Sequence, residues 1–502
     1  MLKKLLLPGI LALLLTMAYL PMLAGASFLV WDDSAQIINN LDLRLGLSAI
    51  GKIFSTFYLD MYQPLTTLSY WLDIKLWGYN ALAFHLVSLG LHLLNCYLVF
   101  KLLRKLNFKK ELAVASCLFF ALWPTQVEAA AWLSARSTLL SATGILLTLL
   151  LYLRYLSTSE KKYYWLSLLC YLAGLLAKVS VAGMWLLLPL LLLGQRRQTW
   201  RDWAKASPFA LLSIALLAWA AVGRHLAGQP LSAEYSSWYL PFYAYSLLSS
   251  ALRVAWPFRL SPLYPFPGHT LAIIALISLI SLAAYTLWGY IQKKPWSFWL
   301  AWLLVCLAPS AAITPRLITI TGDRYAYLAG LPILIFFVWL LSRLKQPAKY
   351  LCLGLVLAAA AWGTINYAAA WTDDRSLWDY AVASQPRHCW TWYTRGYTIM
   401  VASGFPAALP DFRRAGDLCS RDQQMSDMIS RLFLDNRRFN EALVYLRNSL
   451  AAREQASTHH NIAMAYLGLK QTPAACREIG IALAQGLKPD PAIKKYCPLL
   501  KY

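Results

Sequence analysis

The chain has 502 residues, of which 59% are hydrophobic and 14% are charged, and its formal net charge at pH 7 is +23. Together with a mean hydropathy of +0.49, this composition excludes an ordinary soluble enzyme and is typical of a polytopic membrane protein. The excess of Lys and Arg does not require a nucleic-acid partner, because short basic loops facing an anionic cytoplasmic leaflet account for it.

The chain opens with two lysines and a long apolar run, MLKKLLLPGILALLLTMAYLPMLAGA. The small residues at its end are also compatible with a cleaved signal peptide. Because the run is close to spanning length, we expect an uncleaved anchor over residues 5–24.

Ten further apolar runs of about 17 to 22 residues are long enough to cross a bilayer. An all-α membrane domain with eleven transmembrane helices is therefore predicted, with the later spans at 83–103, 112–128, 138–156, 163–179, 181–195, 206–222, 269–289, 297–313, 326–342 and 350–370. Another stretch, 238–256, contains Pro241, Arg253 and many aromatic residues. Counting it as a span would move the basic loops that follow it to the outer face, so we expect it to lie along the interface.

The basic residues orient these spans. With the N-terminus inside, nineteen of the 29 Lys and Arg before residue 371 lie in short inner loops, as the positive-inside rule requires. Four loops (25–82, 129–137, 223–268 and 314–325) and everything after residue 370 are then placed on the outer face.

Residues 371–502 are more polar and contain a repeat. Small residues recur at offsets near 34, in two sets: Ala408, Ala442, Ala475, and Ala415, Ser449, Ala482. This period is typical of tetratricopeptide repeats, and Trp392, Gly396, Ala463 and Tyr466 fall on consensus positions; a generic helical bundle is the alternative. Stacked repeats form concave surfaces, so we expect this domain to dock a protein or peptide.

The nine cysteines divide between the two parts of the chain. Five lie in predicted spans, where they act as small apolar residues. The other four are Cys389, Cys419, Cys476 and Cys497. An even number in a domain expected to face an oxidising compartment is compatible with two disulfides, and four free thiols remain the alternative.

The first outer loop carries a pair of acids in the sequence FLVWDDSAQIINN. Asp32 and Asp33 directly follow the first span, where carboxylates are costly to hold. Either could act as a base that takes the proton of an attacking hydroxyl. The alternative is that they cap the helix that follows, for which Asp is well suited.

Two later outer loops add charged residues. The stretch FALWPTQVEAAAWLSARSTLL spaces Glu128, Trp132 and Arg136 four residues apart, which predicts one helical face, and the two charged residues could form a structural pair or bind substrate. The stretch ITPRLITITGDRYAYLAGLP places more candidates at the outer end of span ten. Cations near a departing phosphate would stabilise it, and the candidates in or near these loops are Arg136, Lys178, Arg316 and Arg324. Tyr325 and Tyr327 could add hydrogen bonds or belong to the interfacial aromatic belt.

No metal site is predicted. His85 and His92 lie seven residues apart on the second span without a third ligand nearby, which favours a structural role. The chain also lacks a Gly-rich phosphate loop, an HExxH motif and a nucleophile elbow.

The order of these motifs is informative as a whole. WDDSAQIINN, YQPLTTLS, FHLVSLGLHLLN, FALWPTQVEAAAWLSARSTLL and GDRYAYLA, followed by outward-facing repeats, resembles the transmembrane-and-TPR O-mannosyltransferase family and its bacterial relatives. Those proteins belong to the GT-C superfamily of glycosyltransferases, which use a sugar linked to polyprenyl phosphate.

The resemblance implies a GT-C membrane domain over 1–370, with about eleven spans and juxtamembrane helices, and a TPR-like domain over 371–502. It implies an inverting transfer of a sugar to an outer-face hydroxyl, Ser or Thr of a protein, in a bacterial inner membrane with a cytoplasmic N-terminus and a periplasmic C-terminal domain. The lipid-linked sugar is a substrate, and no cofactor is implied. Asp32 is favoured as the base over Asp33, and Arg324 is expected near the donor phosphate.

The chain departs from the family pattern at four places, and these bear on donor identity more than on fold. Gln63 stands where arginine is common, Trp123 replaces a histidine, Val179 replaces an acid after Lys178, and Asp323 replaces a glutamate. Gln63, Glu128 and Asp323 remain candidates for other substrate contacts. The alternatives are a GT-C enzyme acting on a lipid or glycan, and a membrane scaffold that uses its repeats to recruit envelope partners.

Overall fold

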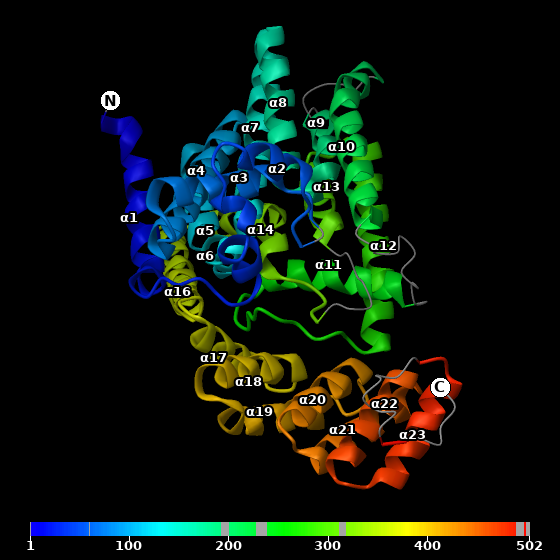
Figure 1. The fold of residues 1–502 in the computed structure, drawn as a ribbon. Helices are drawn as coiled ribbons and strands as arrows, with labels where there is room; N and C mark the ends of the chain where they lie inside the picture. Colours follow the sequence, from blue (N-terminus) through cyan, green and yellow to red (C-terminus); the bar gives the residue numbers. More distant parts are fainter. Residues whose placement is uncertain are drawn as a thin grey trace. The chain divides into compact units, whose positions relative to one another are not determined.

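The computed structural model describes residues 2–59, 61–191, 200–226, 238–310, 318–487 and 496–497. Throughout these ranges the regular elements are helices (Figure 1), which confirms the predicted all-α fold class. The chain divides into two compact units, Met1–Leu377 and Trp378–Tyr502. We call them the membrane unit and the repeat unit.

Every predicted span overlaps a helical segment of the membrane unit. Among the described residues, six helices are long and apolar enough to cross a bilayer, and two bent pairs raise this number to eight. The remaining segments are shorter, so the count of eleven stays a prediction. The helices at the predicted spans are α1 (Leu2–Ala24), α4 (Ala81–Lys105), α5 (Lys110–Leu122), α7 (Arg136–Thr158), α8 (Lys161–Ala177), α9 (Leu187–Leu190) with the 3-10 segment Val179–Leu186, α10 (Trp200–Leu226), α12 (His269–Ile291), α13 (Trp296–Leu307), α15 (Leu331–Ser342) and α16 (Ala348–Ala370).

The two bent pairs position the candidate site. Helix α5 meets a short helical stretch, Pro124–Ala131, at 57°, and Asp323–Ala329 meets α15 at 61°. Pro124 and Pro332 lie at these bends, where a ring without an N–H interrupts the helical hydrogen bonds. Two short helices adjoin the bends, α6 (Val127–Ala131) and α14 (Ala326–Ala329). Helix α6 carries Glu128, and α14 directly follows Asp323 and Arg324.

The segment predicted as the first outer loop folds back on the spans through helices α2 (Ala49–Ser55) and α3 (Pro64–Trp77). Thr66 donates a hydrogen bond to the carbonyl of Ala177, 2.9 Å away, and Tyr70 donates one to the carbonyl of Leu133, 2.8 Å away. Helix α3 therefore joins the end of α8 to the loop before α7.

Helix α11 (Tyr239–Ala255) covers the stretch 238–256, which we expect to lie along the membrane interface. It runs crosswise to α12 in Figure 1 and is not among the helices that pass the length and apolarity test for a span. Its position in the membrane interface stays a prediction.

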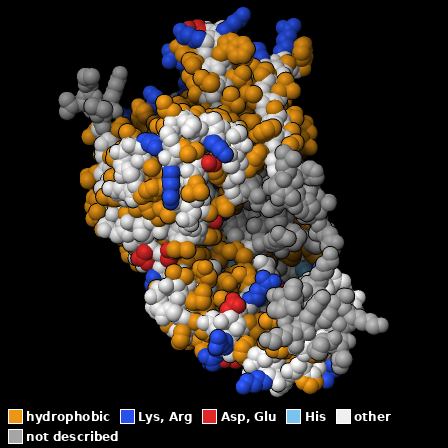
Figure 2. Space-filling view, viewed as in Figure 1, with side chains coloured by type: hydrophobic (Ala, Val, Ile, Leu, Met, Phe, Trp, Pro, Cys, Tyr) orange, Lys and Arg blue, Asp and Glu red, His pale blue; other side chains and the backbone are white. Residues whose placement is uncertain are grey.

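The outer surface of the membrane unit is suited to lipid. Large hydrophobic side chains, including Leu211 on α10, Ile277 on α12 and Leu355 on α16, are exposed. Figure 2 shows hydrophobic side chains over much of this unit and Lys and Arg gathered at the end where α8 begins. The close packing of α7 on α8 depends on glycine, because a Cβ on Gly144 would lie 2.7 Å from the Cα of Gly174, as at other small-residue interfaces in membranes.

The repeat unit consists of paired helices. Three hairpins follow α17 (Asp374–Ser384): α18 (Cys389–Ser403) with α19 (Phe405–Leu418), α20 (Gln423–Asp435) with α21 (Phe439–Ala452), and α22 (Ala456–Gly468) with α23 (Thr472–Ala484). The six small residues that recur at the predicted period are all buried between these helices. A Cβ on Gly396 would lie 2.9 Å from the ring of Phe412, so a small residue lets α18 approach α19 closely.

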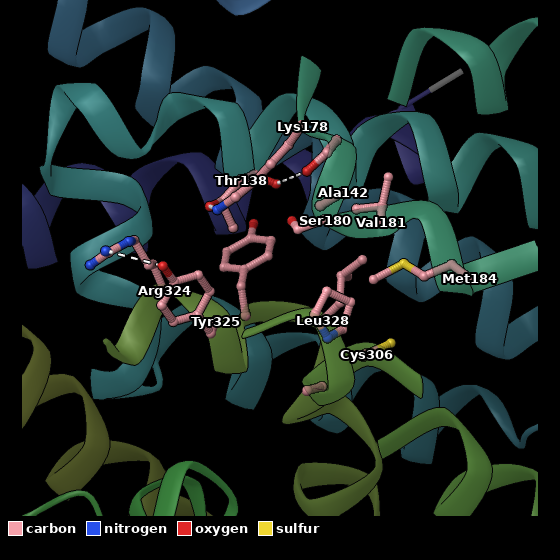
Figure 3. A pocket seen from close by; sticks show the side chains of 14 residues that line it. Thr138, Ala142, Lys178, Ser180, Val181, Met184, Cys306, Arg324, Tyr325 and Leu328 are labelled. Atoms are coloured by element: carbon pink, nitrogen blue, oxygen red, sulfur yellow. Dashed lines mark hydrogen bonds between the residues drawn. The ribbon is translucent and has the colours of Figure 1, made fainter. Parts of the chain in front are cut away.

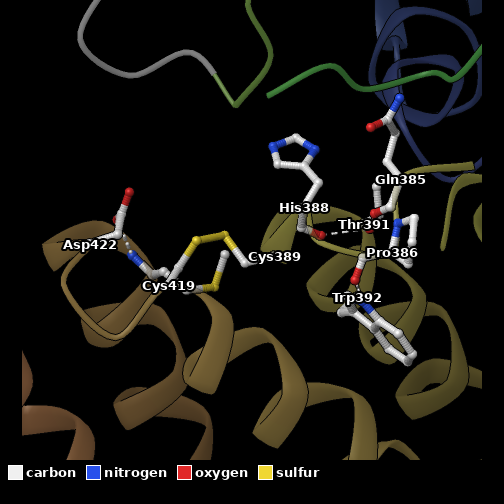
Figure 4. The surroundings of a disulfide bond; sticks show 9 residues. Gln385, Pro386, His388, Cys389, Thr391, Trp392, Cys419 and Asp422 are labelled. Carbon is white, nitrogen blue, oxygen red and sulfur yellow. Dashed lines mark hydrogen bonds between the residues drawn. A yellow bond between two sulfur atoms is a disulfide. The ribbon is translucent and has the colours of Figure 1, made fainter. Parts of the chain in front are cut away.

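The four cysteines of this unit form disulfides, Cys389–Cys419 and Cys476–Cys497. The first joins the start of α18 to the residue after α19, and so closes the first hairpin (Figure 4). Of the two alternatives left open by the sequence, the structure has the disulfides.

The predicted boundary after residue 370 and the division between the compact units differ by seven residues. The intervening residues pack on the membrane unit: the Trp371 ring stacks on Trp132 with centroids 5.9 Å apart, and the Asp374 carboxylate accepts the Val30 backbone N–H at 3.0 Å.

Candidate functional site

Asp33 anchors the loop that follows α1. Its buried carboxylate accepts hydrogen bonds from the backbone N–H of Ser134 at 2.9 Å, the Ser134 hydroxyl, and the backbone N–H of Leu29 at 3.1 Å. It makes no capping bond to the helix that follows, so the capping interpretation is wrong for Asp33. Burial raises the pKa of Asp33 to about 6, although the hydrogen bonds oppose this rise.

Asp32 has different surroundings. Its carboxylate makes no hydrogen bond or ion pair with any residue that the structure describes. Burial raises the pKa of Asp32, and the nearby charge of Arg324 opposes that rise. This acid is therefore free to accept a proton beside a cation.

Arg324 is fixed by Glu128, which is fully buried. The Glu128 carboxylate accepts the Arg324 backbone N–H at 3.1 Å and also pairs with its guanidinium. This close approach depends on Gly322, because a Cβ there would lie 2.5 Å from Nη1 of Arg324 and 2.9 Å from Oε1 of Glu128. The arginine side chain remains 17% exposed, so it can still meet a ligand.

Trp132 connects the loop after α1 with the loop before α14. The guanidinium of Arg324 lies 4.8 Å from the centre of its ring, and Trp31 stacks on it with ring centroids 4.6 Å apart. The loop bearing the two acids and the loop bearing Arg324 thus contact the same side chain.

A narrow cavity of about 40 Å³ lies beside Arg324 and Tyr325 (Figure 3). Lys178 lines it, donates a hydrogen bond to Thr138 at 2.8 Å, and lies 5.1 Å from the ring centre of Tyr325. Tyr327 also lines the cavity, but its hydroxyl contacts His92 at 2.7 Å and Asn95 at 3.3 Å in the core. Two cations on one cavity could neutralise an anionic group such as a phosphate.

Asp323 is engaged by other residues. Its buried carboxylate pairs with Arg253 at 3.0 Å and accepts the hydroxyl of Tyr264 at 2.8 to 2.9 Å. Gln63 is similarly buried, and its amide nitrogen donates to the side chain of Gln36 at 3.1 Å. Neither residue lines the cavity.

The expected helical face bearing Glu128, Trp132 and Arg136 is wrong. Helix α6 ends at Ala131. A separate 3-10 turn follows over Leu133–Ala135, and the next α-helix begins at Arg136. Of the two alternatives left open for Glu128 and Arg136, the structural pair is wrong, because Glu128 pairs with Arg324.

Arg136 is fully buried and pairs with Asp73. It also donates to the Phe84 carbonyl at 2.8 Å and to the Ser88 hydroxyl at 3.2 Å. The structure does not bring Arg136 to the cavity. Arg316 lies outside the described residues.

The sequence interpretation missed Ser134, Asp73 and Arg253 as partners of candidate residues. The role of Asp73 could have been predicted from the sequence, because it is the only acid in α3 and a buried arginine needs a carboxylate. Within the described ranges, no group of three or more His, Cys, Asp or Glu side chains could hold a metal ion. His92 contacts Tyr327 and the Ala121 carbonyl.

Comparison with known proteins adds a second line of evidence. No protein-family model matches the chain. Over 154 residues it is 34% identical to the protein O-mannosyl-transferase TMTC1 of Mus musculus, which covers 26% of this chain and 16% of that protein. The human TMTC1 is 33% identical over 154 residues (26% and 18%), and Tmtc1 of Drosophila melanogaster is 30% identical over 158 residues (30% and 18%). The matched chain spans less than a fifth of the length of these three curated relatives.

Proposed function

We propose that this protein is a GT-C membrane glycosyltransferase that moves a sugar from a polyprenyl-phosphate carrier to Ser or Thr hydroxyls of a protein on the outer face. The observation that carries the proposal is the position of the Asp32 carboxylate, which lacks a hydrogen-bond partner among the described residues and is within electrostatic reach of Arg324. Similarity to proteins named protein O-mannosyl-transferases supports the same reaction class.

In the proposed reaction, Asp32 takes the proton of the acceptor hydroxyl as its oxygen attacks the anomeric carbon. The bond between that carbon and the phosphate oxygen breaks on the opposite side, so the configuration inverts. The polyprenyl phosphate leaves with an additional negative charge, which Arg324 and Lys178 neutralise. Tyr325 is close to both cations and could donate a hydrogen bond to the phosphate.

Asp33 is a positioning residue in this proposal. Its hydrogen bonds to Leu29 and Ser134 hold the first loop against the loop before α7. The neighbouring Asp32 then lies within the electrostatic influence of Arg324, which Glu128 fixes. Engagement by protein partners favours structural roles for Asp323, Gln63 and Arg136.

We place the N-terminus in the cytoplasm and the repeat unit in the periplasm of a bacterial inner membrane. The two disulfides support an oxidising compartment for the repeat unit. Its helical hairpins are suited to docking a protein or peptide acceptor.

A reconstituted transfer assay tests the proposal. The purified protein in liposomes receives a panel of polyprenyl-phosphate sugars with a labelled hexose, together with Ser- and Thr-containing acceptor peptides. We expect label on peptide hydroxyls, located by mass spectrometry, and none when a nucleotide sugar replaces the lipid donor. Label confined to lipid or glycan would favour the alternative GT-C enzyme, and no transfer from any lipid donor would contradict the proposal.

A further inference from the structure

A second cavity lies away from the candidate site in the membrane unit. It has a volume of about 1110 Å³ and is formed by the turn between α4 and α5, the start of α5, the end of α15 and the start of α16. Its wall is largely apolar and includes Leu112, Leu118, Phe119, Leu353 and Leu357. In a membrane, an apolar space of this size favours hydrocarbon over water.

The mouth of this cavity is basic. Lys109, Lys110, Arg343 and Lys349 all line it. Lys349 pairs with Glu111 at 3.2 Å, whereas the other three make no ion pair with a described residue. The N-termini of α5 and α16 and the C-termini of α4 and α15 all lie at this end, so the helix dipoles add little net charge there.

Aromatic residues mark the depth of this basic mouth. The Arg343 guanidinium lies 4.6 Å from the ring centre of Trp339, and the Lys349 ammonium lies 5.0 Å from that of Tyr350. Trp and Tyr concentrate at the headgroup level of a bilayer. The cations are therefore at the depth of lipid phosphates, and the apolar wall is at the depth of acyl chains.

We propose that this cavity binds an anionic phospholipid, with its phosphate beside Lys109, Lys110 and Arg343 and an acyl chain along the apolar wall. The chemistry selects this occupant, because a zwitterionic lipid would leave the net charge of three cations uncompensated, and a free phosphate would leave the apolar wall empty. The site does not depend on the proposed glycosyltransferase activity.

Native mass spectrometry of the full-length protein tests the selectivity. The protein is incubated with phosphatidylglycerol or phosphatidylcholine of identical acyl chains. We expect phosphatidylglycerol to be retained at least tenfold better, and the triple variant Lys109→Gln, Lys110→Gln, Arg343→Gln to lose this preference. The control Arg154→Gln, Lys161→Gln, Lys162→Gln has the same change in charge on another predicted inner loop and should retain it. Equal retention of both lipids by the wild type would overturn the proposal.

A second variant tests the apolar wall without changing charge. Gly354 lines the cavity, and a Cβ there would meet no atom within 4 Å, so Gly354→Phe fills the space without a clash at its Cβ. We expect this variant to retain several-fold less phosphatidylglycerol. Gly90→Phe is the matched control, because Gly90 has equally open space on α4.

Wild-type retention in Gly354→Phe would show that the lipid lies elsewhere and would overturn the proposal. Displacement of the bound lipid by millimolar inorganic phosphate would do the same, because it would indicate a site for the free anion. Thermal unfolding in detergent establishes that each variant is folded; if the triple variant is not, Gly354→Phe decides.

Discussion

Asp32 and Asp33 are neighbours in the chain but have different surroundings. The sequence identifies the pair as unusual because carboxylates beside a membrane span are rare. It could not assign their separate roles, since the hydrogen-bond donors to Asp33 include Ser134, which is 101 residues away. The free acid is the one that the resemblance favours as base.

Replacing Asp33 should weaken the loop anchor. Asp33→Asn places an amide where Ser134 presents two donors, so we expect lower thermal stability together with lower activity. A double-mutant cycle with Ser134→Ala should give a coupling energy of about 0.5–3 kcal/mol. Additive effects on the unfolding free energy would contradict the anchoring role.

The pH dependence of kcat/KM should reflect the protonation of Asp32. Because burial raises its pKa, the base becomes protonated, and kcat/KM falls, at a higher pH than the ~3.9 of an exposed aspartate. Arg324 favours the ionised acid, so Arg324→Gln should move the acidic limb of the residual activity further upward. An acidic limb that is unchanged or moves to lower pH in Arg324→Gln would contradict an electrostatic interaction between Arg324 and Asp32.

At the scale of elements, the bends at α5–α6 and α14–α15 determine which residues meet. Long apolar runs predict where helices lie, and all eleven runs do contain helix. The breaks beyond Pro124 were not predicted, and they changed the partners of Glu128 and Arg136. Helical spacing predicts contacts only while the helix continues.

Gly322 provides a test of how accurately Arg324 must be held. An added methyl group would contact Arg324 and Glu128 at 3 Å or less, and the flexible arginine would move. We expect Gly322→Ala to lower kcat/KM by about 10- to 100-fold, since small misplacements have effects of this size, with little change in unfolding temperature. Gly90→Ala is the control, and equal activity in both variants would contradict a role for the Arg324 position.

The Arg136–Asp73 pair should matter for stability. Both side chains are buried, so Asp73→Asn leaves a buried cation without its carboxylate and should lower the free energy of unfolding by about 3–5 kcal/mol. The exposed pair Lys162–Glu160 is the control, and Glu160→Gln should have no measurable effect. Denaturant unfolding in detergent measures both variants. A stable Asp73→Asn protein that has lost activity would instead support a substrate role for Arg136.

For the whole molecule, composition, basic loops and the 34-residue period predict an all-α membrane protein with a helical repeat region. The number of spans is harder to obtain, because α8, α13 and the segment Val179–Leu190 are shorter than an ordinary crossing helix. The pairing of the four cysteines in the repeat unit also required the structure, since four cysteines allow three connectivities.

The disulfides should stabilise the repeat unit. They join residues 30 and 21 positions apart, so removing either should lower its unfolding free energy by about 2–4 kcal/mol. Hydrogen exchange of Cys389→Ser and Cys476→Ser should show faster opening in the hairpin concerned. Maleimide labelling of the four repeat-unit cysteines in unreduced wild-type protein would contradict both bridges.

If Asp32 is the base of the sugar transfer, Asp32→Asn should be nearly inactive in the reconstituted peptide-transfer assay, measured beside the wild type. We expect turnover to fall by about 10²- to 10⁴-fold, with unchanged unfolding temperature and unchanged binding of the lipid donor. Wild-type turnover in Asp32→Asn would show that Asp32 is not the base.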